Sequence, residues 1–258
     1  MTAELAGRRA VITGAASGIG AACARLFAER GAAVGVLDVR EAAVDGLVSE
    51  LIASGARALG AACDVGSEAD VAAAVRKVVE QFGGLDTVVA SAGIACPGRT
   101  RELPLSEWET VIRVNLTGVF LTLKHTVGPL VSAGGGTVVT IGSVASLVAA
   151  GRAASYDASK GGVLQLTRAV AAEYADQNIR ANCVCPGIIA TPLAENSQEL
   201  YGPLGPGPER LTATRVRPPI ARAAEPAEVA AVVAFLCSDA SSFMTGAAVP
   251  VDGGYTAV

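Results

Sequence analysis

Short apolar runs rich in β-branched residues alternate with longer segments of helical periodicity along the whole chain. Runs of this length, bounded by glycine or charged residues, are typical of buried strands, and the longer segments are typical of helices. The sequence therefore predicts an α/β fold: one domain over residues 1–258, with a doubly wound, mostly parallel seven-stranded sheet and helices on both faces. The expected strands span residues 9–13, 33–37, 57–63, 86–90, 137–141, 179–185 and 247–251.

Two of the expected helices begin with a capping-box pattern, in which a serine precedes an acidic residue by three positions. Ser67 and Asp70 open the helix that ends at Phe82, and Ser106 and Glu109 open a longer one. The longer helix carries Asn115 in an otherwise apolar stretch. We expect hydrogen-bond partners for this amide, because a buried polar side chain needs them.

The regular alternation of strands and helices is interrupted between residues 193 and 224. Glycines and prolines interrupt this stretch, and it contains four arginines: Arg210, Arg215, Arg217 and Arg222. A long irregular insertion in a compact domain is often a lid or a binding loop. We therefore interpret residues 193–224 as a substrate loop.

A glycine-rich turn separates the first strand from the first helix. Its glycines, Gly14, Gly18 and Gly20, permit a tight turn and a close backbone approach, and the following helix presents free N–H groups at its N-terminus. This context is typical of a site for the pyrophosphate of a dinucleotide, although the spacing is G-x-x-x-G-x-G and not G-x-G-x-x-G.

Asp38 ends the second strand, eighteen residues after Gly20. A carboxylate at this place can accept hydrogen bonds from the hydroxyls of an adenosine ribose, and it repels a 2′-phosphate. Arg40 lies two residues further on, but Ser17, directly before Gly18, is not basic. The predicted cofactor is therefore NAD, with NADP as the less favoured alternative.

Ser143, Tyr156 and Lys160 form the candidate catalytic group. Ser143 follows a predicted strand, whereas Tyr156 and Lys160 stand at positions i and i+4 of a predicted helix and share one of its faces. A free tyrosine titrates near pH ~10, and a nearby cation favours the phenolate, so that the phenol can exchange a proton with a substrate oxygen. The chain has three lysines and seventeen arginines, and only lysine offers a compact charge with adaptable donors.

Composition narrows the range of functions. With 258 residues, 51% apolar composition and a formal net charge of −4, the chain can bury a large core, and we expect no nucleic-acid or membrane partner. The first ten residues show no secretory signal, and no uncharged apolar run reaches the roughly 20 residues of a membrane span. We interpret the six cysteines as buried thiols of a cytoplasmic protein. We expect no metal at Cys183 and Cys185, because the single histidine, His125, leaves a zinc site short of ligands.

A series of short motifs follows in a definite order: Thr13-Gly14-x-x-x-Gly18-Ile19-Gly20, Asp64-Val65, Asn115, Ser143, Tyr156-x-x-x-Lys160, Pro186-Gly187-x-x-x-Thr191 and Asp252-Gly253-Gly254. Each motif is weak alone, but in this order and spacing the chain resembles the short-chain dehydrogenase/reductase family over essentially its whole length. The resemblance implies a Rossmann fold, a homotetramer, and an NAD(P)-dependent oxidoreductase that interconverts alcohols and ketones by hydride transfer.

The resemblance also implies roles for individual residues. Tyr156 would be the general acid/base, Ser143 would hold the substrate oxygen, and Lys160 would lower the pKa of the tyrosine and bind the nicotinamide ribose. Asn115 would hold a water that links Lys160 to solvent. Asp64 would contact the adenine, and Ile189 and Thr191 the nicotinamide amide. The full set of expected cofactor-binding residues is Gly14, Ser17, Gly18, Ile19, Gly20, Asp38, Asp64, Val65, Ser91, Gly93, Tyr156, Lys160, Ile189 and Thr191.

One position departs from the family pattern. Ala90-Ser91-Ala92-Gly93 stands where the family usually has Asn-Asn-Ala-Gly. A serine hydroxyl can still donate and accept a hydrogen bond, but it reaches less far than an asparagine amide. The usual contacts of this position to the cofactor and to the central sheet are therefore in question.

Alternative functions and the nature of the substrate stay open at this stage. The alternatives are an NADPH-dependent 3-oxoacyl-carrier-protein reductase, which Asp38 disfavours, a non-catalytic nucleotide-sensing module, and a nucleotide-sugar epimerase or dehydratase. The arginines of residues 193–224 could favour an acid or thioester, whereas apolar neighbours of the site favour an uncharged alcohol or ketone. Those neighbours are Ile94, Val144, Ala145, Leu147, Ile188 and Leu193. Small residues that would let a second helix approach in a tetramer are Ala158, Gly161, Gly162 and Ala169.

Overall fold

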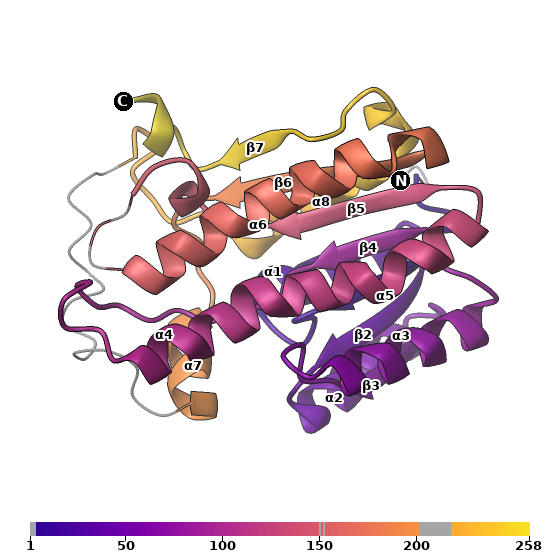
Figure 1. Ribbon diagram of the computed structural model, residues 1–258. Coiled ribbons are helices and arrows are strands. Elements are labelled where there is room, and N and C mark those ends of the chain that lie inside the picture. The colour runs from indigo at the N-terminus through magenta and orange to yellow at the C-terminus, as the bar shows by residue number, and fades with distance from the viewer. Residues whose placement is uncertain (1–3, 150, 152, 202–217) are drawn as a thin grey trace.

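The computed structural model describes residues 4–149, 151, 153–201 and 218–258, and its centre is a sheet of seven parallel strands (Figure 1). The strand order is β3-β2-β1-β4-β5-β6-β7, so the direction of winding reverses between β1 and β4. This confirms the predicted doubly wound α/β fold. The strands are β1 (Arg9–Thr13), β2 (Ala33–Asp38), β3 (Ala58–Ala62), β4 (Thr87–Ala90), β5 (Gly136–Ile141), β6 (Ile179–Pro186) and β7 (Ala248–Val251).

Helices cover both faces of the sheet (Figure 1). Strands buried on both faces are apolar at nearly every position, which explains the continuous apolar runs of the sequence. In β6, Cys183 and Cys185 face one helical layer and Val184 faces the other. One layer contains α1 (Gly18–Glu29), α2 (Glu41–Ala53) and α8 (Pro226–Cys237); the other contains α3 (Glu68–Phe82), α4 (Leu105–Ile112), α5 (Gly118–Ser132) and α6 (Ala154–Glu173).

The long helix expected to start at Ser106 differs from the prediction in two ways. It begins at Leu105, because Pro104 has an extended backbone and takes the N-cap position, so Ser106 lies inside the first turn and is not the cap. It is also not one regular helix, since a π-helical segment, Arg113–Thr117, joins α4 to α5. The other capping prediction is confirmed: Ser67 caps α3, and its side chain accepts a hydrogen bond from the Asp70 N–H (3.4 Å).

The insertion after β6 is not irregular throughout. Its first residues form helix α7 (Leu193–Tyr201), whose buried Ser197 is 1% exposed. Propensity alone does not predict this helix, because its stability comes from packing against the rest of the protein. Arg222 pairs with Glu228 of α8 through two contacts of 2.7 and 2.8 Å. The other predicted arginines of this stretch, Arg210, Arg215 and Arg217, lie outside the described residues.

The polar residues that were expected to follow strands gather at the carboxyl edge of the sheet. Asp38 is the last residue of β2, and Ser91 and Ser143 follow β4 and β5. The connections leave this edge in opposite directions on the two sides of the β1–β4 boundary. In open α/β sheets, a crevice for ligands forms at such a reversal. Within the described part of the chain, no helix is both long and apolar enough to cross a membrane.

Candidate active site

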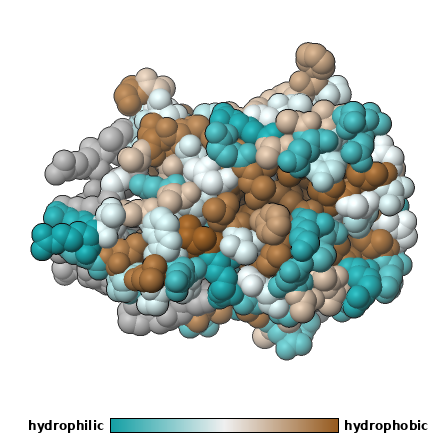
Figure 2. Space-filling view, in the orientation of Figure 1, coloured by the Kyte–Doolittle hydropathy of each residue, from teal (hydrophilic) through white to brown (hydrophobic). Residues whose placement is uncertain are grey.

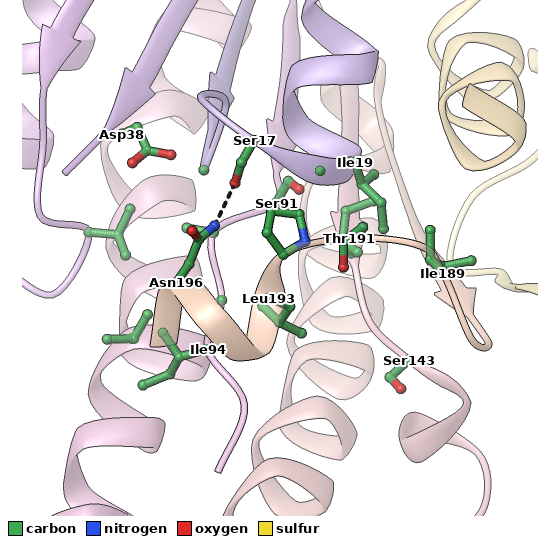
Figure 3. A pocket seen from close by; sticks show the side chains of 18 of the residues that line it. Ser17, Ile19, Asp38, Ser91, Ile94, Ser143, Ile189, Thr191, Leu193 and Asn196 are labelled. Carbon is green, nitrogen blue, oxygen red and sulfur yellow. Dashed lines mark hydrogen bonds between the residues drawn. The ribbon is translucent and has the colours of Figure 1, made fainter. Parts of the chain in front are cut away.

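A single cleft at the carboxyl edge of the sheet brings most of the predicted site residues together (Figure 3). We call it the cofactor cleft. Two predicted residues, Gly20 and Asn115, lie behind its wall instead of lining it. The predicted residues that line it are Gly14, Ser17, Gly18, Ile19, Asp38, Asp64, Val65, Ser91, Gly93, Ser143, Tyr156, Lys160, Ile189 and Thr191.

The turn after β1 can pass close to the segment after β4 only because it is built from glycine. Gly14 has φ +63°, and a Cβ atom there would lie 2.6 Å from the Cα of Ala92. A larger residue would therefore push the two central strands apart at the cleft. The Ser91 N–H donates to the Thr13 hydroxyl (3.2 Å), so a contact to the central sheet is kept at Ser91 through the backbone.

The N-terminus of α1 points its free N–H groups at the same end of the cleft. Ser17 stands at the N-cap position, yet among the described residues its side chain makes no capping bond. Its hydroxyl oxygen accepts hydrogen bonds from Arg40 (2.9 Å) and Asn196 (3.1 Å) instead. The first-turn N–H groups of the helix thus remain available for an anion, and they fit the pyrophosphate of a dinucleotide.

Asp38 is fixed beside this turn and is 7% exposed. Its carboxylate accepts hydrogen bonds from the Ala16 N–H (3.1 Å), the Arg40 N–H (3.1 Å) and the Arg40 Nε–H (3.2 Å). A carboxylate has about four acceptor positions, so one remains for a ribose hydroxyl. Sequence reasoning noted Arg40 but did not assign it to the site, and it missed Asn196, for which the sequence carried no signal.

Asp64, the expected adenine contact, is held by the protein itself. One carboxylate oxygen accepts from the Gly66 N–H (2.8 Å), and the other pairs with Arg113 (2.8 Å), the first residue of the π-helical segment. These contacts fix Asp64 at the rim of the cleft, and they connect the adenine end to the segment that carries Asn115.

Ser143 is positioned by a short turn that is tied to α6. It caps the 3-10 turn Val144–Ser146, and its hydroxyl accepts from the Ala145 N–H (3.1 Å). The Ser146 hydroxyl accepts from the Ser143 N–H (3.2 Å) and donates to the Lys160 carbonyl (2.8 Å). The strand end and the helix that bear the candidate catalytic residues are therefore locked to each other.

Tyr156 and Lys160 lie on one face of α6, as their spacing predicts. The Lys160 ammonium is 5.6 Å from the centre of the Tyr156 ring and donates to the carbonyl of Ile141, the last residue of β5 (2.8 Å). Lys160 is 5% exposed, and burial lowers its pKa to about 8, against the opposing effect of Cys183 and Cys185.

Burial of Tyr156 acts against the predicted lowering of its pKa. Burial raises the pKa of Tyr156, hydrogen bonding to Ser143 opposes this, and the charge of Asp157 adds to it. Desolvation disfavours a phenolate, and the ammonium of Lys160 is engaged with a backbone carbonyl. Tyr156 therefore rests as a protonated phenol.

Asn115 holds the loop after β4 in place. It is fully buried in the π-helical segment, and its Oδ1 accepts from the Ile94 N–H (2.8 Å). Its Nδ2 donates to the Ile94 carbonyl (3.0 Å) and to the Ser159 hydroxyl (3.2 Å). A Cβ on Gly93 would lie 3.4 Å from the Asn115 Oδ1 and 3.5 Å from the Lys160 Nζ, so the amide lies behind the cleft near the lysine. Its link to Lys160 through a water stays a prediction.

The expected apolar wall is only partly present. Ile94 and Leu193 line the cleft, but Val144 and Ala145 are buried inside the 3-10 turn, and Leu147 and Ile188 are exposed. Proximity in sequence therefore predicted more apolar lining residues than the cleft has, because neighbouring residues of a loop point in different directions.

Of the six cysteines, Cys63 alone lines the cleft, and His125 does not line it. The His125 ring lies 3.2 Å from Glu68 on the surface, and all six thiols are free and buried. Among the described residues, no cluster of three histidine, cysteine, aspartate or glutamate side chains could hold a metal ion.

Comparisons with known sequences agree with this geometry. A family model described as enoyl-(acyl carrier protein) reductase matches residues 14–256. The chain is 47% identical to cis-4-hydroxycyclohexanecarboxylate dehydrogenase of Sinomonas cyclohexanicum, with 100% of both chains covered. It is 41% identical to cyclohexanol dehydrogenase of Acinetobacter sp. (strain SE19), with 96% of this chain and 94% of the relative covered.

Solved structures of similar proteins superpose closely. Levodione reductase has 36% sequence identity and a TM-score of 0.89, with 98% of this chain and 99% of the other covered. A short-chain type dehydrogenase/reductase from Mycobacterium marinum has 35% identity and a TM-score of 0.87, with 98% and 97% covered. The sequence match over nearly the whole chain and the shared architecture lead to one conclusion: the chain belongs to the short-chain dehydrogenase/reductase family.

Proposed function

We propose that this protein is an NAD-dependent dehydrogenase that interconverts a secondary alcohol and a ketone, with Tyr156 as general acid/base. The observation that carries the proposal is the meeting of Ser143, Tyr156 and Lys160 at one end of a cleft whose other end holds the glycine turn and Asp38. A protein that only binds a nucleotide would have no need for Ser143, Tyr156 and Lys160. Because these three residues share one cleft with the glycine turn and Asp38, an enzyme is favoured.

NAD supplies the hydride acceptor when it is bound, and the chain supplies position and proton handling. The α1 N-terminus would hold the pyrophosphate, Asp38 the adenosine ribose, and Ile189 and Thr191 the nicotinamide amide. Ser143 would donate a hydrogen bond to the substrate oxygen. Tyr156 would pass a proton between its Oη and that oxygen, and the Lys160 charge would favour the phenolate when the proton has left.

For the substrate, we propose a secondary alcohol on a saturated ring. The relative at 47% identity is named for a hydroxycyclohexanecarboxylate, and the relative at 41% identity is named for cyclohexanol. The apolar side chains of Ile94 and Leu193 at the cleft suit a ring without charge near the reacting carbon. Another relative, at 37% identity, is a D-threitol dehydrogenase, so an open-chain polyol is the matched alternative in any substrate panel.

We infer NAD rather than NADP from the environment of Asp38. Its buried carboxylate keeps one acceptor position for a ribose hydroxyl, which a 2′-phosphate could not use. The competing 3-oxoacyl-carrier-protein-type reductase would use NADPH. Comparing the dissociation constants of NADH and NADPH by fluorescence separates the two, and tighter binding of NADPH would overturn this inference.

We further propose one domain with residues 193–224 as its substrate loop, a homotetramer, and a cytoplasmic location. The exposed Phe120 on α5, together with Ala158 and Ala169 on α6, supports assembly through this face. Gly161 leaves open space where a Cβ would stand, while Gly162 packs against Leu116 inside the protomer. The six free thiols support a reducing compartment.

The experiment that tests the function follows nicotinamide absorbance with NAD and NADP across cyclohexanols, open-chain secondary alcohols and polyols. Tyr156→Phe is expected to lower kcat by roughly 10²- to 10⁴-fold, the usual contribution of general acid–base catalysis. Tyr174→Phe, which makes the same change at the C-terminal end of α6, is the matched control and should stay within twofold of the wild type. Undiminished turnover in Tyr156→Phe would refute the role of Tyr156.

A further inference from the structure

Helix α7 reaches across the cofactor cleft and is fastened to both of its sides (Figure 3). Leu193, Asn196 and Leu200 stand at positions i, i+3 and i+7 and line the cleft. The buried Ser197 accepts a hydrogen bond from the Ala95 N–H (3.0 Å), which ties the helix to the loop after β4. Asn196 makes the connection to the opposite, adenosine end.

Asn196 joins a network of four polar side chains there. Its Oδ1 accepts from Arg40 (2.9 Å) and its Nδ2 donates to Ser17 (3.1 Å), while Arg40 also donates to Ser17 (2.9 Å) and to Asp38 (3.2 Å). Figure 3 shows the Asn196 amide directed at the Ser17 hydroxyl from the α7 side. Asn196 thus contacts two residues of the cleft wall from a segment that was expected to be irregular.

The network decides what the Ser17 hydroxyl can do. A serine oxygen has two acceptor positions and one donor hydrogen. Asn196 and Arg40 take both acceptor positions, so the oxygen cannot cap the first turn of α1, which is what a serine at this place ordinarily does. The O–H hydrogen remains free to donate to an oxygen of a ligand.

We propose that Asn196 is a positioning residue for dinucleotide binding: it holds the Ser17 hydroxyl in a donating orientation and so keeps the α1 N-terminus free for the pyrophosphate. This inference rests on the proposed function, because it needs a dinucleotide in the cleft. Without Asn196, the Ser17 oxygen regains an acceptor position and competes with the phosphates for the same N–H groups.

The test measures NADH binding by fluorescence in wild type, Asn196→Ala, Ser17→Ala and the double variant. Asn196→Ala is expected to raise the dissociation constant of NADH and the KM for NAD by roughly three- to tenfold, which is the range for the net contribution of one hydrogen bond. The kcat should stay within twofold, because Asn196 does not touch Ser143, Tyr156 or Lys160. In the Ser17→Ala background, the Asn196→Ala effect should vanish, since the competing hydroxyl is gone.

Two further variants separate this role from a general loosening of α7. Gln198→Ala changes an exposed residue of the same helix and should leave NADH affinity within twofold. Ser197→Ala removes the other anchor of α7 without touching Ser17. It should affect NADH affinity less than Asn196→Ala does.

Three results would overturn the proposal: wild-type affinity in Asn196→Ala, an equal effect of Asn196→Ala with and without Ser17, or an equal loss in Ser197→Ala. The proposed function fails in a different way. If wild-type protein bound neither NADH nor NADPH, the dinucleotide itself would be excluded, and the inference about Asn196 would fall with it.

Discussion

Lys160 is buried under the end of β5 with its ammonium bonded to the Ile141 carbonyl, and Tyr156 stands one helical turn before it. Burial disfavours charge on both side chains, so it lowers the pKa of the lysine and raises that of the tyrosine. The resting pair is a protonated phenol beside an ammonium that titrates near pH 8. A phenol in this state is poised to donate a proton to a carbonyl oxygen.

Burial of Lys160 makes the stability of the protein depend on pH. The pKa of this lysine is about 8 in the folded protein, below the ordinary value of 10.5 that it regains on unfolding, so between these values the unfolded chain binds more protons. The free energy of unfolding should therefore rise with pH in this window, by at most about 1.4 kcal/mol per pH unit from this residue. Urea unfolding should be measured for wild type and Lys160→Met at pH 7 and pH 9. From pH 7 to pH 9, the free energy of unfolding should rise more in the wild type than in the variant. Parallel changes in the two proteins would contradict a depressed lysine pKa.

At the scale of elements, the π-helical segment Arg113–Thr117 links the ends of the cleft. It presents Arg113 to Asp64 at one end and Asn115 to the loop after β4 at the other. A π-helical segment widens a helix by one residue and often occurs at functional sites. Here one short segment of the chain contacts both Asp64, through Arg113, and the loop after β4, through Asn115.

Asn115→Ala should destabilise the protein, because it removes the hydrogen bonds of the Asn115 amide to the Ile94 backbone and to the Ser159 hydroxyl. Leaving buried polar groups unsatisfied costs about 1–3 kcal/mol, and we expect a loss of this size in urea unfolding. Thr110→Ala, which removes an exposed hydroxyl bond to the Ser106 carbonyl on α4, should cost less than about 0.5 kcal/mol. Equal stabilities of the two variants would show that the Asn115 amide bonds contribute little.

At the scale of the molecule, apolar side chains gather on the face formed by α5 and α6 (Figure 2). Phe120 is 48% exposed there, beside a helix that presents Ala158 and Ala169 to the outside. An exposed aromatic residue on an apolar face is typical of an interface between subunits.

Phe120→Glu should therefore dissociate the proposed tetramer, because it would bury a charge in the interface. Size-exclusion chromatography with light scattering should report a smaller assembly at an unchanged far-ultraviolet circular dichroism spectrum. Ile52→Glu is the matched control, since Ile52 is 54% exposed on α2 in the opposite helical layer. A monomeric wild type, or a variant of unchanged mass, would contradict the assignment of this face.

The sequence by itself determined the fold and most of the cleft, because the information is local. Buried parallel strands must be apolar over their whole length, a tight turn beside a helix needs glycine, and Tyr156 and Lys160 share a helix face through their spacing alone. The tertiary structure decided what depends on distant contacts. Helix α7 and the Asn196 network exist because residues far apart in the chain meet at Ser17. Burial raises the pKa of Tyr156, and the sequence could not predict this effect, because desolvation depends on everything that surrounds a side chain.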